Sequence, residues 1–321
     1  MSRGLPKLLG VIGAGQMGAG IAQVAATAGL QVAAAATASY AHPPVFTALP
    51  QHRVRNGLAM VPPSQVVLVD RAAEQLERAA AGMRLSLGKI VKRGMLKEEP
   101  EAVLQRLQHA TDLEALAVAD YVVEAVPENE GLKTGIFRQL DALMPPHAVL
   151  ASNTSSISIT RLAAATRRPD RVVGLHFMNP VPLMTLIELV RGLQTSDETF
   201  EATQRLAVLL GKTTCVSLDR PGFIVNRILM PMINEAFFAL MEGVGSAHDI
   251  DIGMKLGTNQ PMGPLTLADF IGLDTCLSIM RVLHEQLGDS KYRPCPLLVQ
   301  YVDAGWLGKK SGRGVYTYST S

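Results

Sequence analysis

The sequence predicts an α/β protein with two domains: a doubly wound, mostly parallel sheet over residues 1–218 and an all-α domain over residues 219–321. Two observations predict this division. Short apolar runs alternate with helix-forming stretches as far as residue 218, which is the pattern of a parallel sheet with crossover helices. Beyond residue 218 the apolar residues lie in helical stretches only.

The composition is that of a globular protein, with 48% hydrophobic and 18% charged residues. The net charge of +2 gives no reason to expect nucleic acid or a membrane as a partner. The three cysteines lie far apart and suit neither a disulfide framework nor a metal site, so we expect no metal and a reducing compartment, the cytoplasm. Six glycines and three glutamines interrupt the apolar residues 8–32, which argues against a signal peptide or a membrane helix.

The first predicted strand, residues 8–12, is followed by G-A-G-Q-M-G and then by a helix over residues 19–28. A strand, G-x-G-x-x-G and a helix form the dinucleotide-binding turn of a Rossmann-type fold, where glycines let the backbone approach a pyrophosphate. A tight turn in some other α/β protein is the alternative. The predicted cofactor-binding residues of this turn are Gly13, Gly15, Gln16, Met17 and Gly18.

In such a fold an acidic residue follows the turn by about 20 positions and holds the ribose hydroxyls. The first acid in the chain is Asp70, 52 residues after Gly18. Residues 33–64 contain five prolines and no Asp, Glu or Lys, so we interpret residues 33–66 as an irregular insert, whose removal would place Asp70 18 residues after Gly18. In the competing interpretation residues 31–36 form the second strand, and ribose recognition lacks its acid.

Two helices are predicted next, a long one over residues 71–93 and a shorter one over residues 99–109, followed by a buried strand over residues 121–126. Ligands of open α/β sheets bind beyond the carboxyl ends of the strands. Glu128 and Lys133 follow this strand and are therefore candidates for the nicotinamide end of the cofactor. An ordinary helix start with one charge pair is the alternative.

The next strand, residues 148–151, ends in a run of hydroxyl and amide side chains, S-N-T-S-S. Such a run can cap a helix, or it can donate hydrogen bonds to a bound carbonyl group. The remaining predicted elements of this domain are strands over residues 172–177, 186–190 and 213–218 and a helix over residues 197–210.

Two of these strands each hold one ionisable residue between apolar neighbours, His176 in the first and Glu188 in the second. A buried carboxylate needs a partner, and this imidazole is the nearest one available. A paired histidine and glutamate form a general base with its orienting acid. The alternative is a core histidine beside a glutamate on the open side of an edge strand.

The helical domain begins with residues 223–244, which are apolar on most faces and which we expect to be broken at Pro231. Such a helix is buried against its own domain and against a second subunit. Asn226 is a polar residue on this helix, and a capping or interhelical hydrogen bond is its alternative role. Residues 264–287 and 295–306 complete the predicted domain.

Five motifs occur in order along the chain: GVIGAGQMGAGIAQ at residues 10–23, ASNTSS at 151–156, GLHFMNPVP at 174–182, PGFIVNR at 221–227 and PMGPL at 261–265. With these motifs the chain resembles the L-3-hydroxyacyl-CoA dehydrogenase family, and within it the short-chain, 3-hydroxybutyryl-CoA members. The resemblance covers the whole chain except residues 33–66.

This resemblance implies the NAD-linked oxidation of a 3-hydroxyacyl-CoA to the 3-ketoacyl-CoA. It implies that His176 is the catalytic base, that Glu188 orients it, and that Ser155 and Asn226 bind the C3 oxygen of the substrate. It also implies a homodimer formed through the C-terminal helices. The cofactor contacts that it implies are Asp70, Glu128, Lys133, Ser155 and Asn179.

Two other functions stay open at this point. Related folds oxidise small hydroxy acids such as gulonate without coenzyme A, and no sharp coenzyme A motif excludes this reaction. If the insert disables the site, the chain is instead a catalytically silent nucleotide-binding protein.

Overall fold

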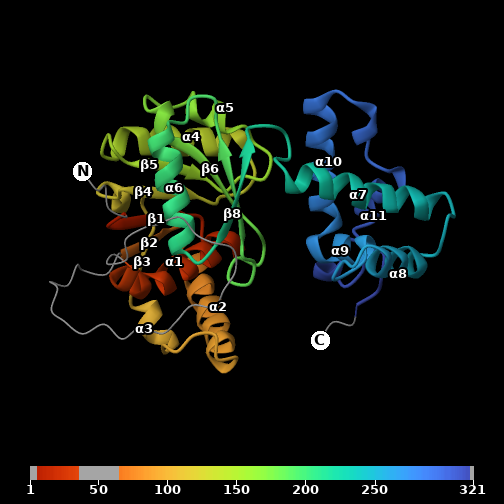
Figure 1. Cartoon of the computed structure of the whole chain (residues 1–321), viewed down its shortest axis with the longest axis horizontal. Helices are drawn as coiled ribbons and strands as arrows, with labels where there is room; N and C mark the ends of the chain where they lie inside the picture. The colour runs from red at the N-terminus through yellow and green to blue at the C-terminus, as the bar shows by residue number, and fades with distance from the viewer. Residues whose placement is uncertain (1–5, 36–64, 319–321) are drawn as a thin grey trace. The chain divides into compact units, whose positions relative to one another are not determined.

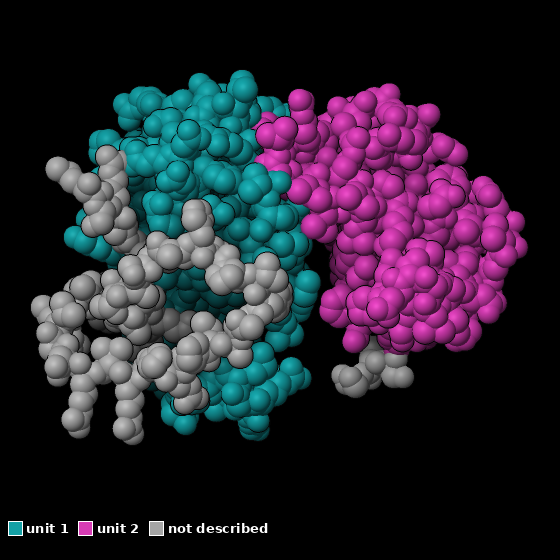
Figure 2. Space-filling view, in the orientation of Figure 1, with its two compact units in different colours: residues 1–154, 159–216 teal, residues 155–158, 217–321 magenta. Residues whose placement is uncertain are grey.

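The computed structural model describes residues 6–35 and 65–318 of the chain. It divides into two compact units, which are coloured separately in Figure 2. Unit 1 consists of residues 1–154 and 159–216, and unit 2 of residues 155–158 and 217–321. The second unit thus takes a four-residue segment from the predicted sheet domain.

Unit 1 is built on an eight-stranded sheet with the strand order β3-β2-β1-β4-β5-β6-β7-β8 (Figure 1). The neighbouring pairs from β3 to β6 are parallel, and β6 and β7 are antiparallel. This confirms the doubly wound, mostly parallel sheet. The strands are β1 (Leu8–Ile12), β2 (Gln65–Val69), β3 (Leu107–Ala110), β4 (Tyr121–Glu124), β5 (Val149–Ser152), β6 (Val172–Phe177), β7 (Leu186–Arg191) and β8 (Thr213–Leu218).

Helices cover both faces of the sheet because the chain runs in two directions along it. From β1 the chain moves to β2 on one side, and from β4 it moves to β5 on the other, so right-handed crossovers place their helices on opposite faces. A buried apolar cluster joins α1, α2 and α6 to alternate strand residues on one face. The helices of unit 1 are α1 (Gln16–Ala35), α2 (Ala73–Lys92), α3 (Pro100–Leu104), α4 (Glu130–Leu143), α5 (Ile159–Ala163) and α6 (Asp197–Leu209).

The second strand is the one that ends at the first acidic residue of the chain. β2 pairs in parallel with β1 over its whole length, and Asp70 follows it directly. Residues 31–35 belong to α1, so the competing interpretation, in which they begin the second strand, is wrong. The predicted insert is shorter than expected, since residues 33–35 continue α1 and residues 65–66 begin β2. Its remaining part, residues 36–64, lies outside the described residues.

The helix predicted over residues 99–109 is wrong in its second half. The structure has the short helix α3 and then the strand β3, which pairs in parallel with β2 at the edge of the sheet. An edge strand has only one neighbour, and in the sequence of β3, L-Q-H-A, two of the four residues are polar and none is buried. The apolar pattern of a strand is therefore missing from the sequence.

In the described part of unit 2 the regular elements are helices, apart from two isolated bridges near the end of the chain. Pro231 lies inside α7, so the expected break at this residue is wrong; packing of buried residues on both sides of Pro231 holds the helix together. The predicted helix over residues 264–287 divides at Gly272. The helices are α7 (Val225–Met241), α8 (Ala247–Gly257), α9 (Pro264–Ile271), α10 (Leu273–Leu287) and α11 (Pro296–Asp303). Within the described residues, no helix has the length and apolar character needed to cross a membrane.

Candidate active site

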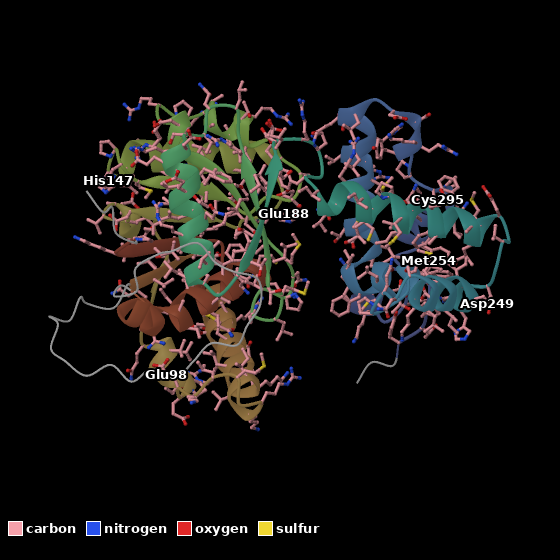
Figure 3. All side chains as sticks on the ribbon, in the orientation of Figure 1. Glu98, His147, Glu188, Asp249, Met254 and Cys295 are labelled. Carbon is pink, nitrogen blue, oxygen red and sulfur yellow. The ribbon has the colours of Figure 1, made fainter. Side chains whose placement is uncertain are left out.

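His176 and Glu188 face each other across the antiparallel strands β6 and β7. The Nδ1 atom of His176 lies 2.8 Å from Oε2 of Glu188, and the carboxylate, labelled in Figure 3, is completely buried. Leu175 and Phe177 belong to the apolar cluster on the α1 side, so the alternation of side chains along a strand turns His176 and Glu188 to the opposite face. The predicted pairing of these two residues is therefore present.

The pairing has a direct chemical consequence for the imidazole ring. A carboxylate only accepts hydrogen bonds, so Nδ1 of His176 is the donor toward Glu188. The proton of the neutral ring is then on Nδ1 and the lone pair is on Nε2. Glu188 thereby selects the tautomer in which Nε2 can accept a proton.

Asn153 fixes the backbone next to this histidine, a role that the sequence did not reveal. Its side-chain oxygen accepts a hydrogen bond of 2.9 Å from the main-chain N–H of Phe177, in a buried position. Its own N–H donates to the main-chain oxygen of Glu124 at 2.8 Å. The carboxyl ends of β4, β5 and β6 are thus tied together beside His176.

A second buried acid–base pair lies at the ends of β4 and β5. The ammonium group of Lys133 lies 2.7 Å from Oε1 of Glu124 and 3.4 Å from Oε2 of Glu128. Glu124 also accepts a hydrogen bond of 2.6 Å from the hydroxyl of Ser152, and Glu128 accepts one of 2.6 Å from Thr154. The predicted candidates Glu128 and Lys133 therefore lie together. Glu124 was missed, although a carboxylate inside the apolar run 121–126 was a signal for it.

Asp70 lies against the glycine-rich turn, at the carboxyl end of β2. Its carboxylate accepts hydrogen bonds from the main-chain N–H groups of Ala14, at 2.8 Å, and Ala72, at 3.0 Å. The N–H of Gly13 donates to Val69 at 2.8 Å, which joins the turn to the end of the same strand. This is the position that a ribose-binding acid requires.

The glycine-rich turn fits a bound dinucleotide. A Cβ atom on Gly18 would lie 1.7 Å from the main-chain oxygen of Gly13, so only glycine allows α1 to start this close to the strand. A Cβ atom on Gly15 would meet no protein atom within 4 Å. The protein itself does not fill the space over Gly15, where a pyrophosphate would approach the amides at the start of α1.

A pocket of about 410 Å³ adjoins this turn. Its walls come from the first half of α1, residues 75–86 of α2 and the loop between β6 and β7. Three predicted cofactor residues, Gly15, Gln16 and Asn179, are among those that line it, and Met17 and Gly18 are not. The pocket therefore joins the turn to the loop that follows His176.

The two predicted substrate-binding residues belong to unit 2. Ser155 opens the segment 155–158, which a hydrogen bond of 2.7 Å from Ser158 to Asp219 fastens to the start of the helical domain. Asn226 is buried in the first turn of α7. His176, Glu188 and the other candidates for cofactor binding belong to unit 1.

The negative charge of Glu188 also affects a cysteine on β8. Burial raises the pKa of the Cys215 thiol, and the charge of Glu188 raises it further. All three cysteines are free thiols. Among the described residues, no group of three or more His, Cys, Asp or Glu side chains could hold a metal ion.

Comparison with known families identifies the family to which this chain belongs. The chain matches the NAD binding domain of 3-hydroxyacyl-CoA dehydrogenase over residues 8–43 and 58–220, and the C-terminal domain of the same family over residues 222–318. The chain belongs to the 3-hydroxyacyl-CoA dehydrogenase family. Residues 44–57, which lie inside the predicted insert, are outside the matched segments.

Individual members of this family are similar over nearly the whole chain. The 3-hydroxybutyryl-CoA dehydrogenase of Bradyrhizobium diazoefficiens is 52% identical over 313 residues, which cover 97% of this chain and 95% of that protein. A probable 3-hydroxybutyryl-CoA dehydrogenase of Bacillus subtilis is 49% identical and covers 97% of each chain. The crystal structure of (S)-3-hydroxybutyryl-CoA dehydrogenase from Ralstonia eutropha has a TM-score of 0.84 and 44% identity, covering 98% of this chain and 99% of that one.

These findings confirm the family, the fold class and the general reaction that the sequence predicted. The protein is a 3-hydroxyacyl-CoA dehydrogenase, an oxidoreductase that uses NAD.

Proposed function

We propose that the enzyme oxidises a short-chain L-3-hydroxyacyl-CoA to the 3-ketoacyl-CoA, and catalyses the reverse reduction, with His176 as general acid–base and Glu188 as its orienting acid. The observation that carries these roles is the 2.8 Å contact between Nδ1 of His176 and the buried carboxylate of Glu188. The short-chain preference is supported by the names of the similar proteins, which are 3-hydroxybutyryl-CoA dehydrogenases.

Oxidation of a secondary alcohol removes a hydride from carbon and a proton from oxygen. NAD, when bound, supplies the hydride acceptor. In the proposed reaction Nε2 of His176 accepts the proton from the C3 hydroxyl, and the carboxylate of Glu188 stabilises the imidazolium that forms. In the reverse direction the same imidazolium returns the proton to the ketone oxygen. Ser155 and Asn226 bind the C3 oxygen.

The cofactor is held along the carboxyl edge of the sheet in this proposal. The glycine-rich turn, Gly13 to Gly18, faces the pyrophosphate, and Asp70 accepts hydrogen bonds from the adenosine ribose. Glu128, Lys133, Ser155 and Asn179 contact the nicotinamide half. A carboxylate at position 70 would repel the 2'-phosphate of NADP, which favours NAD.

The two domains divide this work, with residues 1–218 binding NAD and residues 219–321 completing the substrate site and forming a homodimer. The dimer is supported by exposed apolar side chains on three helices of unit 2: Ile228 on α7, Leu256 on α8 and Phe270 on α9. Sedimentation equilibrium tests it, because a monomeric mass at micromolar concentration would contradict the proposal.

Three free cysteines support a reducing compartment, the cytoplasm.

The experiment that tests the reaction is NADH oxidation with acetoacetyl-CoA and with 3-ketoacyl-CoAs of increasing chain length. We expect the highest kcat/KM with acetoacetyl-CoA. Gulonate with NAD is the control substrate, because it lacks coenzyme A. Turnover of gulonate without turnover of acetoacetyl-CoA would refute the proposed substrate, and a higher kcat/KM with long acyl chains would refute the chain-length preference.

A further inference from the structure

A buried lysine that the proposed reaction does not use lies beside the pocket. Lys212 follows α6, and only 9% of its surface is exposed. The described part of the chain provides no carboxylate that pairs with it, and burial lowers the pKa of its ammonium group. Because a buried charge is costly without compensation, the contacts of this ammonium group indicate why it is there.

Both contacts are to the loop between β6 and β7, residues 178–185, here called the β6–β7 loop. The Nζ atom donates hydrogen bonds to the main-chain oxygens of Val181, at 2.6 Å, and Met184, at 2.7 Å. The next residue, Thr213, donates its N–H to the oxygen of Thr185 at 2.8 Å. Three hydrogen bonds thus join the segment after α6 to this one loop.

The direction of the lysine is set by the end of α6. Gly211 has a φ of 69°, and its N–H donates to Val208 at 2.9 Å. The N–H of Lys212 reaches back to the oxygen of Ala207 at 3.0 Å. This is the Schellman arrangement of a helix end, and it fixes the backbone from which the lysine side chain extends.

The β6–β7 loop is one wall of the pocket described above. Asn179, Pro180, Val181 and Pro182 line it, opposite residues of α1 and α2. Val181 packs closely against Gly20 of α1. A Cβ atom added to Gly20 would lie 2.8 Å from the Cβ atom of Val181. The loop is therefore in contact with α1 on one side and bonded to Lys212 on another.

We propose that Lys212 is a positioning residue for the cofactor site: it holds the β6–β7 loop against α1 and so places Asn179 toward the bound dinucleotide. The proposal rests on the proposed function only in its use of Asn179 as a cofactor contact. Lys212 touches neither substrate nor cofactor in this role, and it acts through the two main-chain oxygens of the loop.

The test is the substitution Lys212→Met, which keeps the length of the side chain and removes the donors. With the loop in its binding-competent arrangement for only part of the time, the apparent Kd rises in proportion. We expect the Kd of NADH, measured by titration of NADH fluorescence, to rise about tenfold, and kcat at saturating NADH to stay within about threefold of the unsubstituted enzyme. Lys212→Arg retains donors and should recover most of the affinity.

Arg168→Met is the matched control. Arg168 is also a buried cation that donates to main-chain oxygens, those of Asp141, Met144 and Pro145, at the end of α4 and not at the pocket. It pairs with the carboxylate of Asp141 as well. The substitution should lower Tm and leave the Kd of NADH unchanged. An unchanged Kd in Lys212→Met, or a Kd that rises equally in Arg168→Met, would overturn the proposal.

Two further features keep the test decisive. If Lys212→Met does not fold, Lys212→Gln takes its place, because its shorter side chain cannot donate to both main-chain oxygens; the Kd should rise about threefold, and an unchanged Kd would contradict the proposal. The titration needs no substrate. A chain that binds NADH but does not reduce acetoacetyl-CoA would refute the proposed substrate and leave the result for Lys212 standing.

Discussion

Two of the buried acid–base pairs in unit 1 are alike in geometry and different in construction. His176 lies 2.8 Å from Glu188, and Lys133 lies 2.7 Å from Glu124. In both pairs the carboxylate side chain is completely buried. The first pair is made by two strands that place the residues directly opposite each other. The second is assembled from β4 and α4, with a hydroxyl from β5 on the same carboxylate.

The difference indicates what each pair can do. Glu188 lies opposite an imidazole ring, whose second nitrogen can accept a proton, so this pair can exchange a proton with a substrate. Glu124 lies opposite an ammonium group, whose nitrogen only donates hydrogen bonds. The first pair is therefore suited to proton transfer and the second to holding the ends of β4 and β5 in place.

The substitution with the largest expected effect breaks the first pair. His176→Gln should lower kcat by roughly 10²- to 10⁴-fold, the usual contribution of a general acid–base group, with little change in the Kd of NADH. Steady-state kinetics with acetoacetyl-CoA and an NADH titration measure the two quantities. A kcat near that of the unsubstituted enzyme would contradict the assignment of His176.

Breaking the second pair should affect stability more than turnover. Glu124→Gln leaves the buried ammonium group of Lys133 without its nearest counter-charge, and we expect a loss of about 3 kcal/mol in the free energy of unfolding. Urea denaturation measures it, and Ser152→Ala, which removes only a neutral donor to the same carboxylate, should cost less. If kcat fell as far as in His176→Gln while stability was unchanged, the contrast between the two pairs would be wrong.

A third buried pair, Asp141 with Arg168, gives a dependence on pH. Burial acts to raise the pKa of Asp141, but hydrogen bonds from Arg167 and Arg168 and the charge of Arg168 lower it below its ordinary value. Its stabilising contribution is therefore complete above the unfolded pKa, about 3.9, and is lost as the pH falls through the lower, folded pKa. Asp141→Asn should be less stable by about 2 kcal/mol at pH 7. Urea denaturation at a series of pH values should show that the difference in unfolding free energy between Asp141→Asn and the unsubstituted enzyme disappears only below about pH 4.

Asp70, the acid at the glycine-rich turn, should affect the choice between NAD and NADP and not the rate of the chemical step. Asp70→Ser removes the carboxylate that repels a 2'-phosphate, so the ratio of kcat/KM with NADP to that with NAD should rise about tenfold. Initial rates with both cofactors measure it. An unchanged ratio would show that the carboxylate does not face the ribose.

The smallest effect is expected at an exposed pair. Glu101 and Arg84 form a hydrogen-bonded ion pair at the surface, and this contact lowers the pKa of the glutamate. Solvent and salt screen such pairs. Glu101→Gln should leave the urea midpoint unchanged. A clear shift of the midpoint would mean that the exposure of a charge pair does not indicate how much it contributes to the stability of this protein.

Much of the sheet could be predicted because buried strands are continuous apolar runs. The predicted bounds of residues 8–12 and 172–177 agree with β1 and β6. Those of residues 213–218 agree with β8, although only Ser217 of that strand is buried. The edge strand β3 and the helix α8, A-H-D-I-D-I-G-M-K-L-G, were missed because they lie at the surface and carry many polar residues or glycines. Burial, which the sequence pattern reports, is weak in these elements.

The site was predictable where its residues are close in sequence and the chemistry is visible. His176 and Glu188 are 12 residues apart on consecutive strands, and each interrupts an apolar run. Asn153 and Lys212 act on main-chain groups 24 and 31 residues away. Their roles depend on the order of the strands in the sheet and on the backbone conformation at the end of α6, and no sequence motif indicates either of these.

The position of Cys215 gives the molecule an intrinsic chemical reporter. Alkylating reagents attack thiolates, so burial and the nearby charge of Glu188 make this thiol a slow target at neutral pH. Burial raises the pKa of Cys276 to about 12, so this second cysteine stays inert under the same conditions. The rate at which iodoacetamide labels Cys215 should therefore increase when the charge at position 188 is removed. Mass spectrometry measures this labelling rate, which reports on the charge of Glu188 without an activity assay.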